Sequence, residues 1–397
     1  MSPLSLAERL GRDTFPAQVY HRQHLHVPGA IPAPGDLITW DDLNNILATH
    51  RLDPPRLRLS AEGEMLPQYR YSAPVTTRRH TVWQRLHPAE LHERLTEGAS
   101  LVIDAVDELH PAVGRAAMEL EQWLRAGVQT NLYASWTARE GFGVHWDDHD
   151  VVVAQVDGSK RWKIYGPTRT APMYKDTEEP EDPPEKPLTE IVMRPGDLLY
   201  LPRGWWHSVA ASEGEHSLHL TFGIQTTTGA QLVSWLSDEL RRKEVLRLDL
   251  PVFAPPEEQA DYLERLKKEV VAALEDPGVL TRYMGVRDAE DVTRMRPSLP
   301  HIGTVPALPE LRVRLTTARA LCEDADDGDG VTFRACGNEW DMAPAAGPLL
   351  RRLISAVPDA VTLGELAATA QLSLDDAAGV ITELVHGQAV AVEGGSA

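Results

Sequence analysis

The chain has 397 residues, with 39 Lys and Arg against 59 Asp and Glu, which gives a formal net charge of −20. A hydrophobic content of 42% and a charged content of 25% are typical of a globular protein, and the length predicts more than one domain. The acidic excess argues against a nucleic-acid partner bound by direct phosphate neutralisation, and it favours a basic protein or peptide partner. Two cysteines are too few for a disulfide framework.

The distribution of apolar residues bears on where the protein works. No apolar run approaches the roughly 18 residues that a membrane-spanning helix needs. The first residues, MSPLSLAERLGRDTF, lack the charged and apolar regions of a secretory signal. We therefore expect a soluble, cytoplasmic protein with no membrane partner.

The N-terminal part predicts two amphipathic helices. The first runs from Thr39 to His50, with apolar residues at helical spacing, and Thr39 and Asp42 match the capping pattern. The second runs from His110 to Gly127, where the glycine is expected to end the helix.

From 128 to 225 the pattern changes to short strands bounded by Gly, Pro and Asp. Several β-branched or aromatic runs in so short a segment predict a closed or sandwich-like jelly roll. An acidic, proline-rich stretch at 175–187 interrupts them and is expected to be an exposed loop. The runs are TNLYAS (130–135), VVVAQV (151–156), KRWKIYG (160–166), DLLYLP (197–202), WWHSVA (205–210) and SLHLTFG (217–223).

The last part of the chain is helical. Two helices are predicted at 230–248 and 257–276, and three shorter ones at 348–357, 362–370 and 373–388, before a terminal strand. Three helices and a strand indicate a winged-helix module. From Ala345 to Ala397 this module has two basic residues against six acidic ones, which argues against a regulator that binds DNA phosphates.

The segment from Gly141 to Pro167 contains the first residues that indicate chemistry. His145 and Asp147 are two apart, so in extended backbone their side chains point to the same side. His207 follows a Pro-Gly-Asp turn and an apolar strand, 60 residues beyond Asp147. Two histidines and one carboxylate on one face leave metal positions open, which suits Fe(II) with a bidentate co-substrate and O₂. The His-x-Asp pair alone is weak evidence, but its place beside buried strands favours a preorganised metal site.

Two other histidines lie near these candidate ligands. We expect His149 and His216 to lie at the surface or next to the site. His149 is close enough in sequence to replace a ligand if the register shifts by two residues.

Lys160 is the second indication of a ligand. In the strand 160–166 it shares a face with Trp162 and Ile164. An ammonium group on an apolar face is unfavourable unless an anion pairs with it. Either Lys160 lies at the start of the strand and extends its amine to solvent, or it binds the carboxylate of a small acid; the two interpretations predict different burial.

Two further strands place polar residues in alternation. Asn131 and Tyr133 share one face of the strand 130–135. Ser217, His219 and Thr221 share one face of a later strand. Each set is either the solvated side of an antiparallel sheet or part of a polar interior around a metal.

The motifs HWD, GSKRW, PGDLLYLPRGWWH and HSLHLTFG, in this order, resemble those of the JmjC-type cupin oxygenases, and most closely the ribosomal-oxygenase branch of protein hydroxylases. The resemblance implies a mainly β fold with α. A double-stranded β-helix, or jelly roll, would occupy residues 1–226, a helical dimerisation region 227–300, and a winged-helix module 301–397. It also implies a homodimer.

The resemblance assigns the metal site. In such enzymes a His-x-Asp pair and a distal histidine hold Fe(II), and they map to His145, Asp147 and His207. The lysine that pairs with the distal carboxylate of 2-oxoglutarate maps to Lys160.

The same resemblance extends to the co-substrate pocket. Tyr133 and Thr221 would help to bind 2-oxoglutarate, and Asn131 would lie near it. The chain departs from many eukaryotic members at Gly223, where they have a serine, and this leaves the details of the substrate side open.

The implied activity is Fe(II)- and 2-oxoglutarate-dependent hydroxylation by O₂, acting on a His or Arg side chain of a ribosomal protein or another basic protein or peptide. Three alternatives remain open. They are a hydroxylase of a peptide natural product, an N-methyl-lysine demethylase, and a cupin that uses another metal for non-oxidative chemistry.

Overall fold

The structure is a computed structural model that divides into two compact units. The first unit contains residues 1–225 with 357–359, and the second contains 226–356 with 360–397. Of the predicted acidic loop at 175–187, residues 175–181 lie outside the described residues. The described residues are 5–61, 63–76, 78–80, 82–137, 143–173, 182–211, 216–225, 227–291, 294–325 and 328–394.

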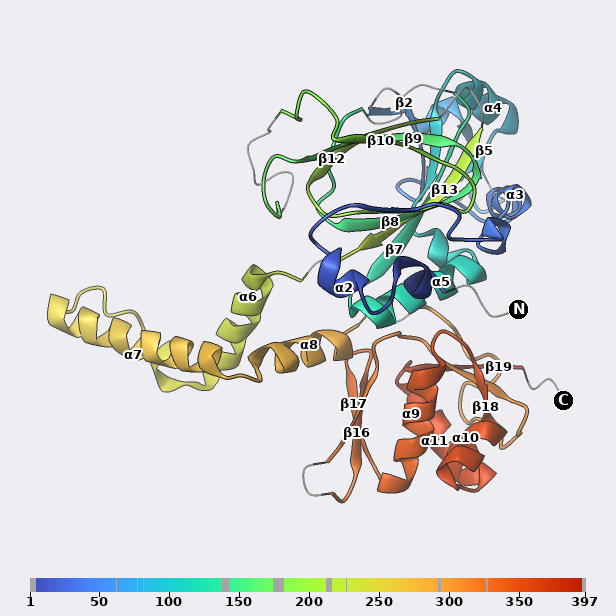
Figure 1. Cartoon of the computed structure of the whole chain (residues 1–397). Helices are drawn as coiled ribbons and strands as arrows, with labels where there is room; N and C mark the ends of the chain where they lie inside the picture. Colours follow the sequence, from blue (N-terminus) through green and yellow to red (C-terminus); the bar gives the residue numbers. More distant parts are fainter. Residues whose placement is uncertain are drawn as a thin grey trace. The chain divides into compact units, whose positions relative to one another are not determined.

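The first unit is built on two antiparallel sheets (Figure 1). The main sheet has the strand order β1-β11-β8-β13-β7-β6-β2-β3, and the second has the order β10-β9-β12. Strands β4 (Ser72–Thr76) and β5 (Val82–Leu86) form a separate hairpin. The other strands are β1 Leu25–Val27, β2 Leu57–Ala61, β3 Glu64–Met65, β6 Ser100–Ile103, β7 Val128–Ser135, β8 Asp150–Gly158, β9 Lys160–Pro167, β10 Thr189–Met193, β11 Leu198–Leu201, β12 Trp205–Ala211 and β13 Ser217–Ile224.

Alternation along β8 shows how the two sheets pack. Val151 and Val153 lie in the core between the sheets, where they pack with Trp162 of β9. Val152 and Ala154 point to the opposite face and join the larger core. The prediction that this strand is buried on both faces is therefore confirmed. All six predicted strands are present, whereas β10 and the N-terminal strands were not predicted.

Helices cover the outer face of the main sheet. Thr39 and Asp42 form the predicted capping box at the start of α3 (Trp40–Thr49). Helix α5 ends three residues before Gly127, because Arg125 takes the left-handed conformation with a φ of 52°. The other helices are α1 Leu6–Leu10, α2 Phe15–Gln18, α4 Pro88–Thr96 and α5 Pro111–Leu124, with short 3-10 helices at Pro34–Asp36, Gln68–Arg70 and Val106–Glu108.

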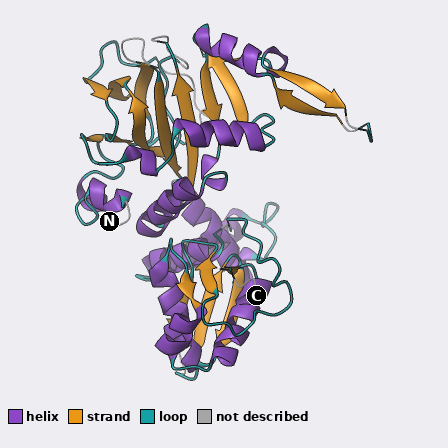
Figure 2. Cartoon of the chain, turned by 90° about the vertical axis from the view of Figure 1, so that its right-hand side faces the viewer, coloured by secondary structure: helices purple, strands orange, loops and turns teal. Residues whose placement is uncertain are grey.

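The second unit combines helices with two small sheets (Figure 2). Four of its helices and the terminal strand match the predicted segments, whereas the helix predicted at 230–248 ends at Glu239 and continues as two short 3-10 helices. Helix α8 and the sheet β15-β16-β17 were not predicted. Its other sheet has the order β18-β14-β19. The elements are α6 Gly229–Glu239, α7 Pro256–Glu275, α8 Val279–Ala289, α9 Gly347–Ala356, α10 Leu363–Ala370, α11 Leu374–His386, β14 Arg312–Leu315, β15 Leu321–Asp324, β16 Val331–Ala335, β17 Asn338–Met342, β18 Val361–Thr362 and β19 Val390–Glu393, with 3-10 helices at Leu240–Arg242, Glu244–Leu246 and Pro344–Ala346.

A buried ion-pair cluster stabilises the second unit next to the end of α8. The guanidinium of Arg319 pairs with Asp288, 3.2 Å between Nη1 and Oδ1, and also with Asp291. Thr317 donates a hydrogen bond of 2.7 Å to Asp291, and the side chain of Arg319 is 6% exposed. The chain thus supplies carboxylates for this buried cation from its own residues.

Within the described residues, no helix combines the length and the apolar character that crossing a bilayer requires.

Candidate metal centre and co-substrate pocket

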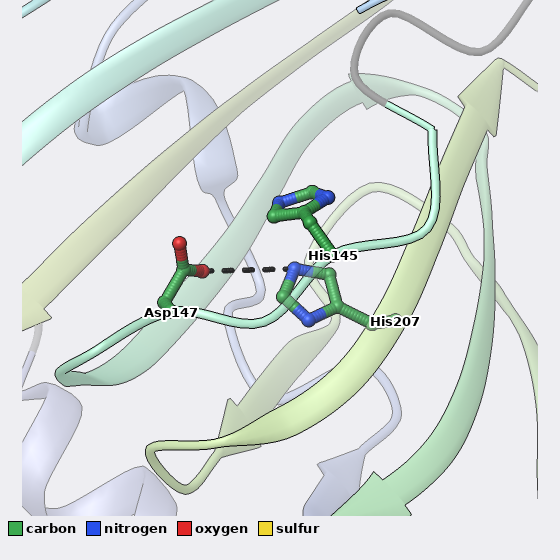
Figure 3. A group of neighbouring side chains, drawn as sticks. All are labelled: His145, Asp147 and His207. Carbon is green, nitrogen blue, oxygen red and sulfur yellow. Dashed lines mark ion pairs between the residues drawn. The ribbon is translucent and has the colours of Figure 1, made fainter. Parts of the chain in front are cut away.

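Three side chains of the types that bind metals lie close together, with Asp147 and His145 both near the ring of His207 (Figure 3). His145 and Asp147 lie on the segment before β8, and His207 lies on β12. Nε2 of His207 is 3.6 Å from Oδ2 of Asp147, and one ligand atom from each residue lies within 4.8 Å of the others. Within the described ranges these three residues form the sole such group. The structure therefore brings together the three predicted ligands.

Backbone hydrogen bonds join the two segments that carry the ligands. The N–H of His145 donates to the carbonyl of His207 (3.0 Å), and the N–H of His207 donates back to His145 (2.8 Å). The N–H of Gly204 donates to the carbonyl of Asp147 at 2.9 Å. This short ladder fixes the three ligands relative to one another before any ion binds.

Asp150 supports the same two segments, a role that the sequence analysis missed. Its fully buried carboxylate accepts hydrogen bonds from the backbone N–H of Arg203 (2.8 Å) and from the hydroxyl of Tyr200 (2.5 Å). Burial and the charge of Asp150 raise the pKa of Tyr200, so its hydroxyl remains a donor. An acidic residue at the start of a fully buried strand is the signal that would have identified it.

Hydrogen bonds also orient the two imidazoles. Nδ1 of His145 lies 3.1 Å from the carbonyl oxygen of Gly143, and Nδ1 of His207 lies 2.9 Å from that of Trp205. A carbonyl oxygen only accepts hydrogen bonds, so Nδ1 carries the proton in both rings. Each Nε2 is then the unprotonated nitrogen, which is the form that a metal ligand requires.

Lys160 is buried inside the barrel, with 5% of its surface exposed. Its ammonium donates a hydrogen bond of 2.8 Å to Ser135, and no carboxylate of the described residues lies within ion-pair distance. Burial lowers the pKa of Lys160 to about 8. The solvent-facing interpretation is therefore excluded. Gly158 makes the preceding turn possible, since a Cβ there would lie 1.8 Å from the carbonyl oxygen of His216.

A row of rings runs along the interior between Lys160 and the metal ligands. Tyr133 stacks on His219 with 5.0 Å between ring centroids, Trp162 lies 6.2 Å from His219, and it stacks on His207 at 5.6 Å. Burial and the charge of Lys160 hold the pKa of His219 well below its usual value. Burial, with the charge of Asp147, raises the pKa of Tyr133 to about 12. The polar residues of β7 and β13 thus line an interior and not a solvated face.

Two of these rings carry buried polar atoms that lack a hydrogen-bond partner. They are Nε1 of Trp162 and Nδ1 of His219. Groups of this kind are rare in folded proteins, because leaving them unpaired is unfavourable. Together with the buried ammonium of Lys160, they fit a small polar anion that would lie between the lysine and the metal ligands.

Residues 110–232 match the family model described as "JmjC domain". This stretch of the chain is therefore similar to JmjC domains. Over 141 residues it is 38% identical to the "Bifunctional lysine-specific demethylase and histidyl-hydroxylase NO66" of Drosophila persimilis, a match that covers 34% of this chain and 20% of that protein. Over 164 residues it is 32% identical to "Ribosomal oxygenase 1" of Rattus norvegicus, covering 40% and 27%. The chain spans about a fifth to a quarter of these relatives.

The fold of this chain is similar to that of a solved structure over nearly the whole length of both. YcfD, "a Ribosomal oxygenase from Escherichia coli in complex with Cobalt and 2-oxoglutarate", superposes with a TM-score of 0.60 and 18% sequence identity. The match covers 96% of this chain and 98% of that one. These comparisons confirm the resemblance to the JmjC ribosomal oxygenases and the predicted jelly roll.

Thr221 and Asn131 face each other on the neighbouring strands β13 and β7. Both are partly buried. The side-chain oxygen of Asn131 accepts hydrogen bonds from the backbone of Ala105 (3.1 Å) and from Gln129 (3.1 Å). Asn131 therefore holds neighbouring segments in place, whereas Thr221 lies on the face shared with His219.

His149 lies outside the metal group. Its Nδ1 pairs with Asp148 at 3.1 Å, and its side chain is 40% exposed. The ring lies against Gly223, where an added Cβ would be 2.9 Å from two ring atoms. A serine at position 223 thus requires His149 to move. His216 is likewise outside the group and pairs with Asp157 at the surface, 3.0 Å away.

Proposed function

We propose that the chain is an Fe(II)- and 2-oxoglutarate-dependent protein hydroxylase that uses O₂. The observation that supports this most strongly is the buried ammonium of Lys160 without a carboxylate, in the same barrel as the His-Asp-His group. A dicarboxylate that reaches from the metal to Lys160 would supply the missing counter-ion. The unpartnered polar atoms of Trp162 and His219 lie along the same interior and fit such a ligand.

Each residue has a distinct task in this proposal. Nε2 of His145, Nε2 of His207 and the carboxylate of Asp147 would hold Fe(II), and Lys160 would bind the distal carboxylate of 2-oxoglutarate. Bound Fe(II), with 2-oxoglutarate and O₂, would supply the oxidation that yields succinate, CO₂ and a C–OH group in place of one C–H bond of the substrate. Tyr133, as a neutral hydroxyl, would donate a hydrogen bond into the co-substrate pocket.

The proposed substrate is a His or Arg side chain of a ribosomal protein. The names of the relatives support a ribosomal target, and the net charge of −20 favours a basic partner. A peptide natural product and N-methyl-lysine remain as alternatives. The burial of Lys160 argues against a non-oxidative cupin, which does not require a buried cation.

We also propose a role for the remaining regions, with the division 1–226, 227–300 and 301–397. The helical region would form a homodimer, and the C-terminal helices with β18-β14-β19 would form a winged-helix module. Large apolar side chains that are exposed in the helical region support the dimer: Leu250, Val252, Phe253, Leu263 and Leu280 are between 59% and 100% exposed. We expect a cytoplasmic enzyme, and light scattering of the purified protein tests the dimer.

Succinate release tests the proposed activity. Purified protein with Fe(II) and 2-oxoglutarate is expected to release succinate, and His145→Ala is expected to abolish it because one metal ligand is lost. His92→Ala is a suitable control, since His92 is exposed on α4. Turnover that survives in His145→Ala would contradict the iron assignment.

The substrate requires a separate experiment. Intact-mass analysis compares ribosomal proteins from cells with and without the gene. A gain of one oxygen atom on one protein, lost in cells that carry His145→Ala, supports the ribosomal assignment. Unchanged masses with continued succinate release would point to another substrate.

A further inference from the structure

The hairpin β4–β5 and its flanks differ in charge from the rest of the chain. The 25 residues 65–89, here called the basic hairpin, contain four arginines, two histidines and no acidic residue, whereas the whole chain has a net charge of −20. Like charges gathered on one short element create a local positive potential that the total charge does not reveal.

The basic hairpin is exposed on both faces. Figure 2 shows the two strands as a separate ribbon that extends away from the main sheet. Val82 is 55% exposed, Trp83 42% and Tyr69 79%. The base of the ribbon packs on the core through Tyr71 and Leu86, so the outer part with its exposed rings remains available to a partner.

One face of the ribbon combines an aromatic ring with cations. Trp83 and Arg85 are two residues apart on β5 and so share a face. From outside the hairpin, the guanidinium of Arg51, which pairs with Asp53, lies 5.8 Å from the Trp83 ring centroid and adds no net charge to this face. Arg78 and Arg79 are exposed in the turn at the tip. Among the described residues, no carboxylate lies within ion-pair distance of Arg78 or Arg85.

We propose that the basic hairpin binds single-stranded RNA. Guanidinium groups pair with phosphates, and exposed indole and phenol rings provide stacking surfaces for bases, a combination that sequence-tolerant RNA binders use. An acidic peptide would pair with the arginines but would gain little from the rings. The acidic surface elsewhere repels a polyanion and would confine it to this element.

This inference does not depend on the proposed hydroxylase activity. The net charge of the whole chain argues against a nucleic-acid partner, and the basic hairpin is an exception to that expectation. That exclusion holds where Asp and Glu prevail, but the segment 65–89 contains neither.

Fluorescence anisotropy with a labelled, unstructured RNA of about 16 nucleotides tests the proposal. The double variant Arg78→Glu/Arg85→Glu is expected to weaken binding at least about tenfold and to reduce the salt slope of log K by about 1.4, since each arginine contributes about 0.7 on a single strand. Trp83→Ala is expected to weaken binding without changing the salt slope, because stacking of a base on the ring releases no counterions. Trp83→Phe keeps an aromatic ring and is expected to retain binding.

Arg241→Glu/Arg242→Glu is the matched control. Both arginines are exposed, at 76% and 69%, and the change in net charge is the same. An equal loss of binding in this control would overturn the proposal, as would no RNA binding by the wild-type protein. Displacement of RNA by poly-glutamate at equal charge concentration would assign the surface to an acidic protein instead. Succinate release by the hairpin variants reports separately on the hydroxylase.

Discussion

The two units each bury a cation, and they do so in opposite ways. In the second unit, Arg319 pairs with two carboxylates of its own chain, Asp288 and Asp291. In the first unit, the ammonium of Lys160 has a single hydroxyl partner, Ser135. Both residues are less than 10% exposed.

The difference separates a structural cation from a binding one. A buried charge whose counter-ions belong to the chain is complete and needs no ligand. A buried charge that has no counter-ion in the chain lowers the stability of the fold, and it is tolerated where a ligand supplies the anion. The comparison can be tested by removing each cation in turn.

The largest expected effect is the loss of stability in Arg319→Met. Asp288 and Asp291 would remain buried without a counter-ion, so the free energy of unfolding should fall by about 3–5 kcal/mol. Urea unfolding of the purified variant measures it. The triple variant that also carries Asp288→Asn and Asp291→Asn should recover most of this loss; if it does not, the carboxylates are not the cause.

Lys160→Met is expected to change stability in the opposite direction. With the pKa of Lys160 lowered from 10.5 to about 8, the unliganded fold should gain about 3 kcal/mol when the charge is removed, since each tenfold change in an equilibrium corresponds to about 1.4 kcal/mol. Urea unfolding without metal or 2-oxoglutarate measures this gain. A variant less stable than the wild type would mean that Lys160 is already paired.

The same comparison predicts a pH dependence. Between about pH 8 and pH 10.5 the unfolded chain keeps a proton at Lys160 that the folded chain releases, so the wild type becomes more stable relative to Lys160→Met as the pH rises. Below pH 8 the difference is constant. Unfolding curves of both proteins at a series of pH values measure it, and parallel stability profiles would contradict the assignment.

Binding of 2-oxoglutarate should depend on the same charge. Lys160→Met is expected to raise the Kd by about tenfold to a hundredfold, because a charged hydrogen bond contributes about 1.5–3 kcal/mol. Lys160→Arg, which keeps the charge, should lose less. Calorimetric titration with the metal held constant measures both, and an unchanged Kd would place the co-substrate elsewhere.

The smallest expected effect is that of Trp162→Phe. The substitution keeps a ring against His207 but removes the unpartnered Nε1. If that group donates to the bound co-substrate, the Kd for 2-oxoglutarate should rise about two- to tenfold, as for one neutral hydrogen bond. An unaltered Kd would show that the indole only packs.

Local patterns in the sequence pointed to two of the three residues of the candidate metal group, whereas His207 was assigned from the resemblance of the motifs. His145 and Asp147 are two apart, and the run 151–156 identifies the strand that follows them. The shared face of Lys160 and Trp162 follows from strand periodicity alone. These predictions hold because each depends on neighbours within a few residues.

The supporting residues could not be predicted in this way. Ser135 of β7 meets Lys160 of β9 because the two sheets pack together, and Asp150 meets Arg203 because β8 pairs with β11. Neither arrangement is encoded by residues close in the sequence. The predicted end of α5 at Gly127 was wrong for a different reason. Arg125 adopts the left-handed conformation and ends the helix earlier, although glycine is the residue that usually takes this conformation.

The hydrogen bonds from the Nδ1 atoms of His145 and His207 have a practical consequence. Both imidazoles already present Nε2, the coordinating nitrogen, so a metal ion would bind without a change in their orientation. The site therefore has no conformational change by which it could select one divalent transition ion over another. Copper, nickel and zinc bind such donors at least as tightly as ferrous iron. Occupancy in the cell would then follow the supply of each element, and protein purified from rich medium will carry whichever competitor that medium provides until it is stripped and reloaded.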